Sequence, residues 1–294
     1  MNATVKGYLQ LCRLPNLPTA AADIIAGIAL AGIFVSNYSI NIHEPVLLIF
    51  SSVFLYAGGV VLNDVFDAKL DAVERPERPI PSGVIPLKKA AVFGAVLLFF
   101  GIMAALSVNS LSGLISFVLA GSILAYDAFS KKHNIIGPLN MGICRGLNLL
   151  LGISILGTLM HLEYLIIPII FIAAITLVSR GEVHGSNKKN IVFAGLLYTI
   201  VLFLVMYFHI INLKSMGKYL PFLIIFAIMV LFPLVKAYLN NTPKNIKGAV
   251  ISGVLGIIVL DATIAAAYSN WQTGVLLLLL LPLSIFLSKI FAVT

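Results

Sequence analysis

Charged residues are scarce in this sequence: they make up 10% of its 294 residues, whereas hydrophobic residues make up 60%. The mean hydropathy is +1.07, which excludes an ordinary soluble globular domain. Cysteine is also scarce, because the chain contains only Cys12, at a helix entrance, and Cys144, inside an apolar stretch. No disulfide framework is therefore expected. We predict an all-α polytopic membrane protein in which residues 1–294 form a single domain.

Several common site patterns are missing from the sequence. It contains no glycine-rich nucleotide loop, no Ser/His/Asp constellation and no CxxC pair, and its five histidines form no cluster. The formal charge of +8 is spread over short loops, so we expect a lipid bilayer and no nucleic acid as partner. Arg13, Pro15 and Asn16 interrupt the first apolar run, so no cleavable signal peptide is expected. Protein partners are not indicated.

Long apolar stretches dominate the chain. A membrane-spanning helix needs about 20 mostly apolar residues, and about ten stretches meet this condition, at residues 16–35, 46–62, 89–107, 110–126, 137–158, 163–179, 190–211, 218–236, 247–267 and 272–291. We therefore expect a bundle of nine or ten spans.

Lysine and arginine are distributed unevenly between the two sets of loops. They precede the first stretch and follow the second, fourth, sixth and eighth, whereas the opposite loops contain only Lys214 and Lys218. Because basic loops stay in the cytoplasm, we expect a multi-pass protein of the cell inner membrane. Its amino terminus and its acidic loops are predicted to be cytoplasmic.

Residues 63–83, NDVFDAKLDAVERPERPIPSG, follow the second apolar stretch and are dense in charge. Asp64, Asp67 and Asp71 recur at spacings of three and four, so a continuing helix sets them on roughly one face, beside Asn63. Such a face repels itself unless a cation binds to it. Oxygen ligands of this kind favour Mg²⁺ that takes its remaining ligands from a substrate phosphate. Two arginines that follow, Arg75 and Arg78, favour this interpretation over an ordinary solvated loop.

Three ionisable residues lie inside apolar stretches, where a charge is expensive to bury. Asp23 shares a helical face with Asn16 and Thr19, and either lines a cavity or makes an interhelical contact. For Asp261 no motif surrounds the residue, so a structural contact is favoured. Arg145 either pairs with a carboxylate such as Asp23 or binds an anionic substrate, and we favour a substrate or a shared cavity.

Two further loops carry polar residues. One precedes and enters the fifth span and contains Tyr126, Asp127, Lys131, Lys132, Asn140 and Asn148, although its two lysines also suit routine topology anchors. The other, residues 179–190, is a weak echo of the first acidic stretch in which Glu182 keeps the only acid. His184 beside it suggests no transition-metal site, because no further His or Cys stands at ligand spacing.

The pattern NDxxDxxxDxxxRPxRPIPSG, preceded by RLPNLPTA, resembles the UbiA superfamily of intramembrane prenyltransferases over essentially the whole chain. The resemblance implies a helical bundle around a central cavity, usually of nine spans. It also implies Mg²⁺ as cofactor, a polyprenyl diphosphate as substrate, and an acceptor that the sequence does not identify. The second loop, SRGEVHGSNKKN, departs from the usual pair of aspartates, and with GPLNMGICRGLNLLLG it resembles the EboC-like branch.

The resemblance and the residues together give a set of candidate roles. Metal ligands are expected at Asn63, Asp64, Asp67 and Asp71. Catalytic roles are expected for Asp64, Asp67, Tyr126 and Lys131. Substrate binding is expected from Asn16, Asn63, Arg75, Arg78, Lys132, Asn140, Arg145, Arg180 and Glu182.

The expected reaction is transfer of a prenyl group after Mg²⁺-assisted ionisation of the diphosphate. Because the second loop keeps one acid, we expect it to bind less metal, with Arg180 and either Lys188 or Lys189 contacting the diphosphate. The alternative is a transporter or prenyl-lipid-binding protein that keeps the fold without the chemistry, since fold does not fix function.

Overall fold

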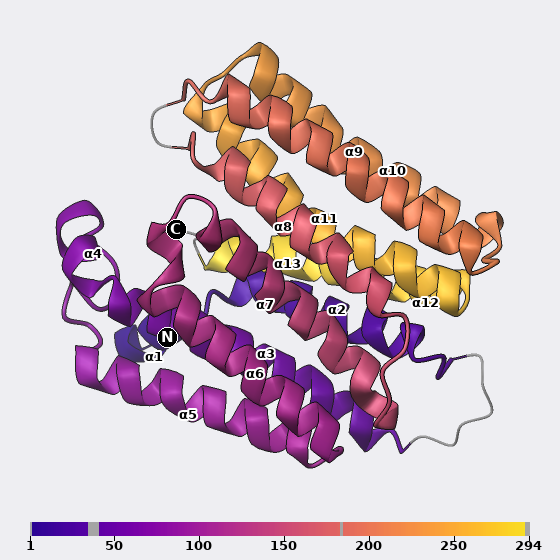
Figure 1. Cartoon of the computed structure of the whole chain (residues 1–294). Helices are drawn as coiled ribbons and strands as arrows, with labels where there is room; N and C mark the ends of the chain where they lie inside the picture. Colours follow the sequence, from indigo (N-terminus) through magenta and orange to yellow (C-terminus); the bar gives the residue numbers. More distant parts are fainter. Residues whose placement is uncertain (1, 35–40, 183–184, 292–294) are drawn as a thin grey trace.

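The apolar stretches fold into a bundle of helices in the computed structural model (Figure 1). The structure describes residues 2–34, 41–182 and 185–291, and within these ranges every regular element is helical. The helices are α1 (Ala3–Leu11), α2 (Leu17–Leu30), α3 (His43–Phe66), α4 (Ala68–Glu74), α5 (Leu87–Leu106), α6 (Ser110–Ala128), α7 (Ile136–Ile153), α8 (Ile166–Ser179), α9 (Lys188–Ile211), α10 (Met216–Leu239), α11 (Pro243–Tyr268), α12 (Trp271–Leu278) and α13 (Leu280–Ile290).

Nine helical segments in the described ranges are long and apolar enough to cross a membrane. They include α12 and α13, which together form one span over Trp271–Ile290. This number confirms the prediction of a nine- or ten-span bundle. The predicted first span, residues 16–35, is instead a shorter apolar helix over Leu14–Leu30.

Local sequence explains where this first helix begins. Arg13 adopts a left-handed conformation, with φ 47° and ψ 53°, which ends the helical path of α1. Pro15 then lies in a single 3₁₀ turn, and Pro18 occupies the first turn of α2, where its missing N–H is tolerated. The chain therefore bends at Arg13 before it enters the bundle.

The loops predicted to be cytoplasmic gather at one end of the molecule. Figure 1 shows α1, α4, the last turn of α13, the end of α8 and the start of α9 at the same end of the bundle. This arrangement follows from the alternating direction of the spans. Their orientation in a cell membrane stays a prediction.

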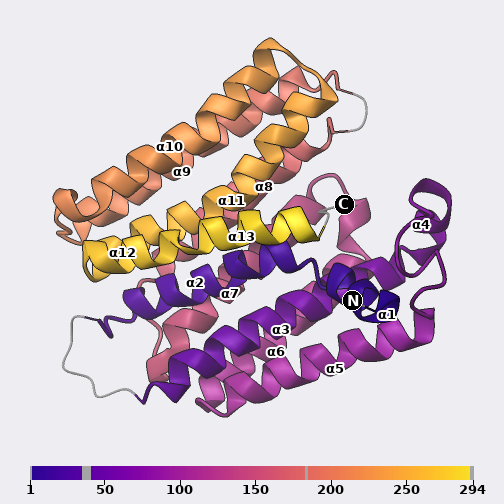
Figure 2. The ribbon, with the colours of Figure 1, turned by 180° about the vertical axis from the view of Figure 1, so that it is seen from behind.

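The interior is formed by α2, α7 and α11. Of the apolar window of α11, 72% is buried, against 17% for the span made by α12 and α13. From the reverse side, α12 and α13 lie across α2 and α11 (Figure 2), and the Ser284 hydroxyl of α13 donates a hydrogen bond to the Pro15 carbonyl. On this side α12 and α13 thereby cover α2 and α11.

Two glycines allow α2 and α7 to cross at close range. A Cβ at Gly27 would lie 2.4 Å from the Leu149 carbonyl oxygen, and one at Gly152 would lie 2.5 Å from the Ile24 carbonyl oxygen. Both neighbours are backbone atoms, so they cannot move aside as a side chain does. The crossing brings the buried Asp23 of α2 against the polar residues of α7.

We expect Gly152→Ala to destabilise the protein by about 1–3 kcal/mol, because the added methyl overpacks a backbone contact. The measurement is thermal unfolding of the purified protein in detergent. Gly121→Ala is the matched control, since a Cβ there meets no atom within 4 Å. Equal melting temperatures for the two variants would contradict the close crossing.

Candidate functional site

A chamber of about 300 Å³ opens among α2, α3, α6, α7, α8 and α11. Much of its wall is apolar, with side chains such as Leu55, Ile123 and Ile257. Its polar lining comes mainly from α2, α3, α6 and α7 and consists of Arg13, Asn16, Thr19, Ser52, Tyr56, Asn63, Tyr126, Asp127, Arg145, Asn148 and Thr176. Mostly apolar concave walls with a few polar groups are typical of a small-molecule site.

The first acidic stretch lies where α3 passes into α4. Helical hydrogen bonds continue through the junction, because the Asp67 amide donates to the Asn63 carbonyl and the Asp71 amide donates to the Asp67 carbonyl. The aspartates therefore keep their helical spacing. Asp64 and Asp71 are buried, at 7% and 4% exposure, whereas Asp67 is half-buried.

Each of these aspartates is paired with a cation. Arg13 Nη2 lies 2.9 Å from Asp64 Oδ1. Arg78 Nη1 lies 3.3 Å from the same oxygen and 2.8 Å from Asp71 Oδ2, so this buried arginine bridges two carboxylates. Lys131 Nζ lies 2.6 Å from Asp67 Oδ1. The positive charges come from the α1–α2 turn, the loop after α4 and the turn after α6.

Asn63 points to a fourth carboxylate rather than to the other three. Its Nδ2 donates to Asp127 Oδ1 at 2.7 Å, which joins α3 to the end of α6. Asp127 is 3% exposed, and its Oδ2 is buried without a hydrogen-bond partner. A buried carboxylate oxygen of this kind is costly unless a donor or a cation reaches it.

The oxygen donors at this end fit a magnesium–diphosphate site better than a closed metal cage. Among the described residues, no three His, Cys, Asp or Glu side chains lie close enough together to hold a metal ion. Mg²⁺ commonly binds through one or two carboxylates, substrate phosphates and several waters. Asn63, Asp64 and Asp67 carry oxygen atoms of the type that such an arrangement uses, and their role as metal ligands stays a prediction.

The second loop faces the first across the same end of the bundle. Burial raises the pKa of Glu182, and the nearby positive charges of Lys247 and Arg75 oppose that rise. The Arg180 guanidinium donates to the Asn134 carbonyl, in the loop that also carries Lys131 and Lys132. Arg75, Lys132, Arg180, Lys188 and Lys189 are exposed. Val183 and His184 lie outside the described residues.

Farther into the bundle, Arg145 makes the carboxylate pairing that the sequence left open. Its Nε lies 2.7 Å from Asp23 Oδ2, and its Nη2 donates to the Thr19 carbonyl at 2.5 Å. Asn148 Nδ2 donates to the same Asp23 oxygen at 2.7 Å, and the Ser52 hydroxyl donates to Asn148 Oδ1. Arg145 also lines the chamber, so it is paired with Asp23 and borders the cavity at the same time.

Asn140 lies apart from the chamber lining. Its Oδ1 accepts from the Ser122 hydroxyl at 2.7 Å, and its Nδ2 donates to the Ser130 hydroxyl at 3.0 Å. These bonds fasten α7 to α6 and to the turn after it. The expected substrate-binding role of Asn140 stays a prediction, as do the roles of the other candidate residues.

Two charged residues of the site were not among the predicted set. The sequence presents Arg13 only as a loop charge and as a residue that interrupts the first apolar run, although it lines the chamber and its guanidinium pairs with Asp64. Asp127 had been noted only as one member of a polar stretch, although it faces Asn63. The position of Asp127 next to Tyr126 is an available signal, whereas Arg13 and Asp64 are 51 positions apart and no local pattern connects them.

The profile of the UbiA prenyltransferase family matches residues 25–251 of this chain. The chain belongs to the UbiA prenyltransferase family. Within this family, it is 33% identical over 165 residues to the digeranylgeranylglyceryl phosphate synthase of Methanosarcina barkeri, a match that covers 53% of this chain and 57% of that protein. It is 29% identical over 187 residues to the synthase of the same name from Saccharolobus solfataricus, covering 64% of each chain. The chain thus spans about half to two thirds of these relatives.

Solved structures of UbiA proteins share the fold of this chain. A structure described as digeranylgeranylglyceryl phosphate synthase superposes with a TM-score of 0.68 and 23% identity, covering 91% of this chain and 99% of the other. The UbiA homologue of Archaeoglobus fulgidus bound to GPP and Mg²⁺ gives a TM-score of 0.64 and 18% identity, covering 88% and 99%. These likenesses confirm the predicted fold. The EboC-like branch stays a prediction, because the matched proteins carry other names.

We expect Arg78→Met to destabilise the protein by about 3–5 kcal/mol, because it removes the cation that bridges two buried carboxylates. Thermal unfolding in detergent measures the effect. Arg75→Met removes an exposed charge from the same loop and is the control, with little expected change. The bridging role fails if both variants melt at the wild-type temperature.

Proposed function

We propose that this protein is a prenyltransferase that moves a polyprenyl group from an allylic polyprenyl diphosphate to an acceptor inside the membrane. The observation that carries the proposal is the row of cation-paired aspartates beside a largely apolar chamber. Membership of the UbiA prenyltransferase family supports it. Further support comes from the family relatives named as synthases and from the UbiA homologue described with bound GPP and Mg²⁺.

Asn63, Asp64 and Asp67 are the residues that would hold Mg²⁺ beside the chamber. The metal, when bound, supplies charge neutralisation on the diphosphate as its carbon–oxygen bond breaks. Asp71 belongs to the same face, but Arg78 holds its Oδ2 at 2.8 Å. We assign to Asp71 the task of keeping this arginine beside Asp64.

Arg13 and Lys131 each form an ion pair that binding of the diphosphate would break. Each pairs with a carboxylate of the proposed metal site, at 2.9 Å and 2.6 Å. When that carboxylate serves as a metal ligand, the cation can turn to a diphosphate oxygen instead, and charge-assisted hydrogen bonds of this kind are strong. Lys131 thereby changes partner during substrate binding rather than remaining a topology anchor.

The chamber wall would surround the prenyl cation that ionisation of the diphosphate produces. Its apolar side chains exclude water, which would otherwise capture the cation. Tyr126 lines the chamber next to the carboxylates, and an aromatic face attracts a cation by about 0.5–2 kcal/mol. Arg180 contacts the loop of Lys131 and Lys132, which supports a place for it near the diphosphate.

We expect Asp67→Asn to lower Mg²⁺-dependent diphosphate release by about 100-fold or more, the usual effect of losing one preorganised electrostatic contact. The assay incubates purified protein with labelled polyprenyl diphosphates. Glu74→Gln, an exposed change on α4, is the control and keeps wild-type activity. Full activity of Asp67→Asn contradicts the proposed site, and binding without release in the wild-type protein favours a lipid-binding or transport role.

A further inference from the structure

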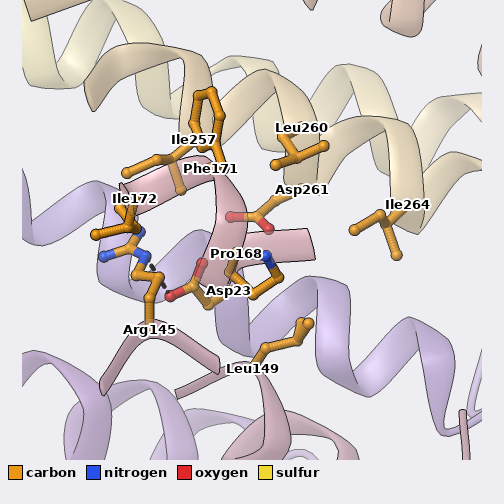
Figure 3. A pocket seen from close by; sticks show the side chains of 10 residues that line it. All are labelled: Asp23, Arg145, Leu149, Pro168, Phe171, Ile172, Ile257, Leu260, Asp261 and Ile264. Atoms are coloured by element: carbon orange, nitrogen blue, oxygen red, sulfur yellow. Dashed lines mark ion pairs between the residues drawn. The ribbon is translucent and has the colours of Figure 1, made fainter. Parts of the chain in front are cut away.

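Two carboxyl groups, those of Asp127 and Asp261, each have one buried oxygen without a hydrogen-bond partner among the described residues. Asp261 lies inside the bundle, where its carboxyl group is turned toward Asp23 and borders a cavity of about 10 Å³ (Figure 3). Arg145 pairs with Asp23 there at 2.7 Å, and the other side chains that line this cavity are apolar. That cluster therefore links α2, α7 and α11 to one another.

Asp127 lies instead at the end of α6, beside the first acidic stretch. Asn63 Nδ2 donates to Asp127 Oδ1 at 2.7 Å. Four residues farther along each segment, Lys131 Nζ lies 2.6 Å from Asp67 Oδ1. Both contacts join residues that are 64 positions apart in the chain. Two cross-links in the same register therefore connect the end of α3 to the end of α6 and the turn that follows it, about one helical turn apart.

The Asn63 amide has a defined orientation because its partner is a carboxylate. An ionised carboxylate only accepts hydrogen bonds, so the nitrogen of the amide must face Asp127. The amide oxygen, Oδ1, is therefore directed away from Asp127. It accepts no hydrogen bond from the described part of the chain, and it is not one of the fully buried polar atoms. Because Asn63 lines the chamber and is half-buried, this oxygen is the group that it can offer to a ligand.

Asp127 itself cannot make such a contact without moving. The residue is 3% exposed, its Oδ1 accepts from Asn63, and its Oδ2 is buried. The carboxylate can therefore act on a ligand only through the amide that it holds. In metal sites, a carboxylate that accepts a hydrogen bond from a metal ligand fixes the orientation of that ligand and raises its basicity.

We propose that Asp127 is a positioning residue of the metal–diphosphate site, which holds the Asn63 amide with its oxygen free for the metal. This inference rests on the proposed function, because it takes Asn63 as one of the residues that would hold Mg²⁺. The two cross-links then have different tasks. Lys131 leaves Asp67 when the diphosphate binds, whereas the Asn63–Asp127 bond is kept and preserves the register of α3 and α6.

The change Asp127→Asn tests the orientation while it keeps the size of the side chain. The new amide can present either oxygen or nitrogen to Asn63, so Asn63 is no longer held in one orientation. The probe is Mn²⁺, added to purified protein with an unreactive prenyl thiolodiphosphate, and free Mn²⁺ is measured by electron paramagnetic resonance. We expect the affinity for Mn²⁺ to fall by about 10–100-fold, the usual effect of losing the outer partner of a metal ligand. An unchanged affinity overturns the proposal.

An exchange of the two side chains tests the cause. In the double variant Asn63→Asp with Asp127→Asn, the amide on α6 donates to the carboxylate on α3 and leaves the second carboxylate oxygen for the metal. The hydrogen bond and the total charge are those of the wild-type protein. We expect the affinity for Mn²⁺ to return to the wild-type value or to exceed it. A double variant that binds Mn²⁺ as weakly as Asp127→Asn overturns the proposal.

The change Ser112→Ala is the structural control for α6. Ser112 Oγ lies 2.7 Å from Ser154 Oγ at the other end of this helix, and both residues are buried. Losing this hydrogen bond loosens the packing of α6 but leaves Asn63 held, so we expect the wild-type affinity for Mn²⁺. Equal losses of affinity in Ser112→Ala and Asp127→Asn overturn the proposal.

Diphosphate release separates a positioning role from a catalytic one. We expect Asp127→Asn to need about 10–100-fold more Mg²⁺ for half-maximal release. Its maximal rate at saturating Mg²⁺ stays close to that of the wild-type protein, because Asp127 touches no reacting atom. A lower maximal rate with an unchanged Mg²⁺ requirement overturns the proposal.

The wild-type protein separates this inference from the proposed function. If it neither binds Mn²⁺ with the analogue nor releases diphosphate, the proposed function fails and the inference fails with it. If it does both, and Asp127→Asn binds Mn²⁺ equally well, the inference alone fails. Should Asp127→Asn not fold, a structure of the wild-type protein with Mg²⁺ and the analogue decides. The Asn63 oxygen on the metal and its nitrogen on Asp127 support the proposal, whereas an oxygen turned away from the metal overturns it.

Discussion

Compensation of buried carboxylates by cations from distant parts of the chain is the constraint on which this structure depends. Asp23, Asp64, Asp67 and Asp71 each lie within ion-pair distance of an arginine or lysine. These pairs tie the turn before α2, the α3–α4 junction, the end of α6 and the middle of α7 into one assembly. In an apolar bundle, losing Arg145 or Arg78 leaves the buried carboxylate of Asp23 or Asp71 without its cation. Two of these pairs, Arg13–Asp64 and Lys131–Asp67, contain the cations that we propose for diphosphate binding.

Much of the fold follows from the sequence, because span length and the spacing of basic loops are physical requirements of a bilayer. The exception is the start of the bundle. Apolar character alone extended the first predicted span to residue 35, whereas Arg13, Pro15 and Pro18 form a bend and α2 covers Leu17–Leu30. Close approach of α2 and α7 at Gly27 and Gly152 is a property of two facing helices, which no single stretch of sequence contains.

For the candidate site, local patterns were more informative than distant ones. The spacing of Asp64, Asp67 and Asp71 pointed to a shared face, and their helical hydrogen bonds do continue across the α3–α4 junction. Their partners could not be predicted, because Arg13 and Lys131 come from other elements. Asp261 seemed isolated in sequence for the same reason, yet the bundle brings it beside Asp23 and Arg145. The site therefore combines an aspartate motif that the sequence shows with counterions, such as Arg13 and Lys131, that only the folded chain places beside it.

We propose that binding of the diphosphate releases Arg13 from Asp64 and Lys131 from Asp67. The most direct measurement is an experimental structure of the protein with Mg²⁺ and an unreactive prenyl thiolodiphosphate. We predict the diphosphate beside Asn63, Asp64 and Asp67, with Arg13 and Lys131 turned from these carboxylates to its oxygens. A diphosphate bound elsewhere, with the Arg13–Asp64 and Lys131–Asp67 pairs still at 2.9 Å and 2.6 Å, would contradict it.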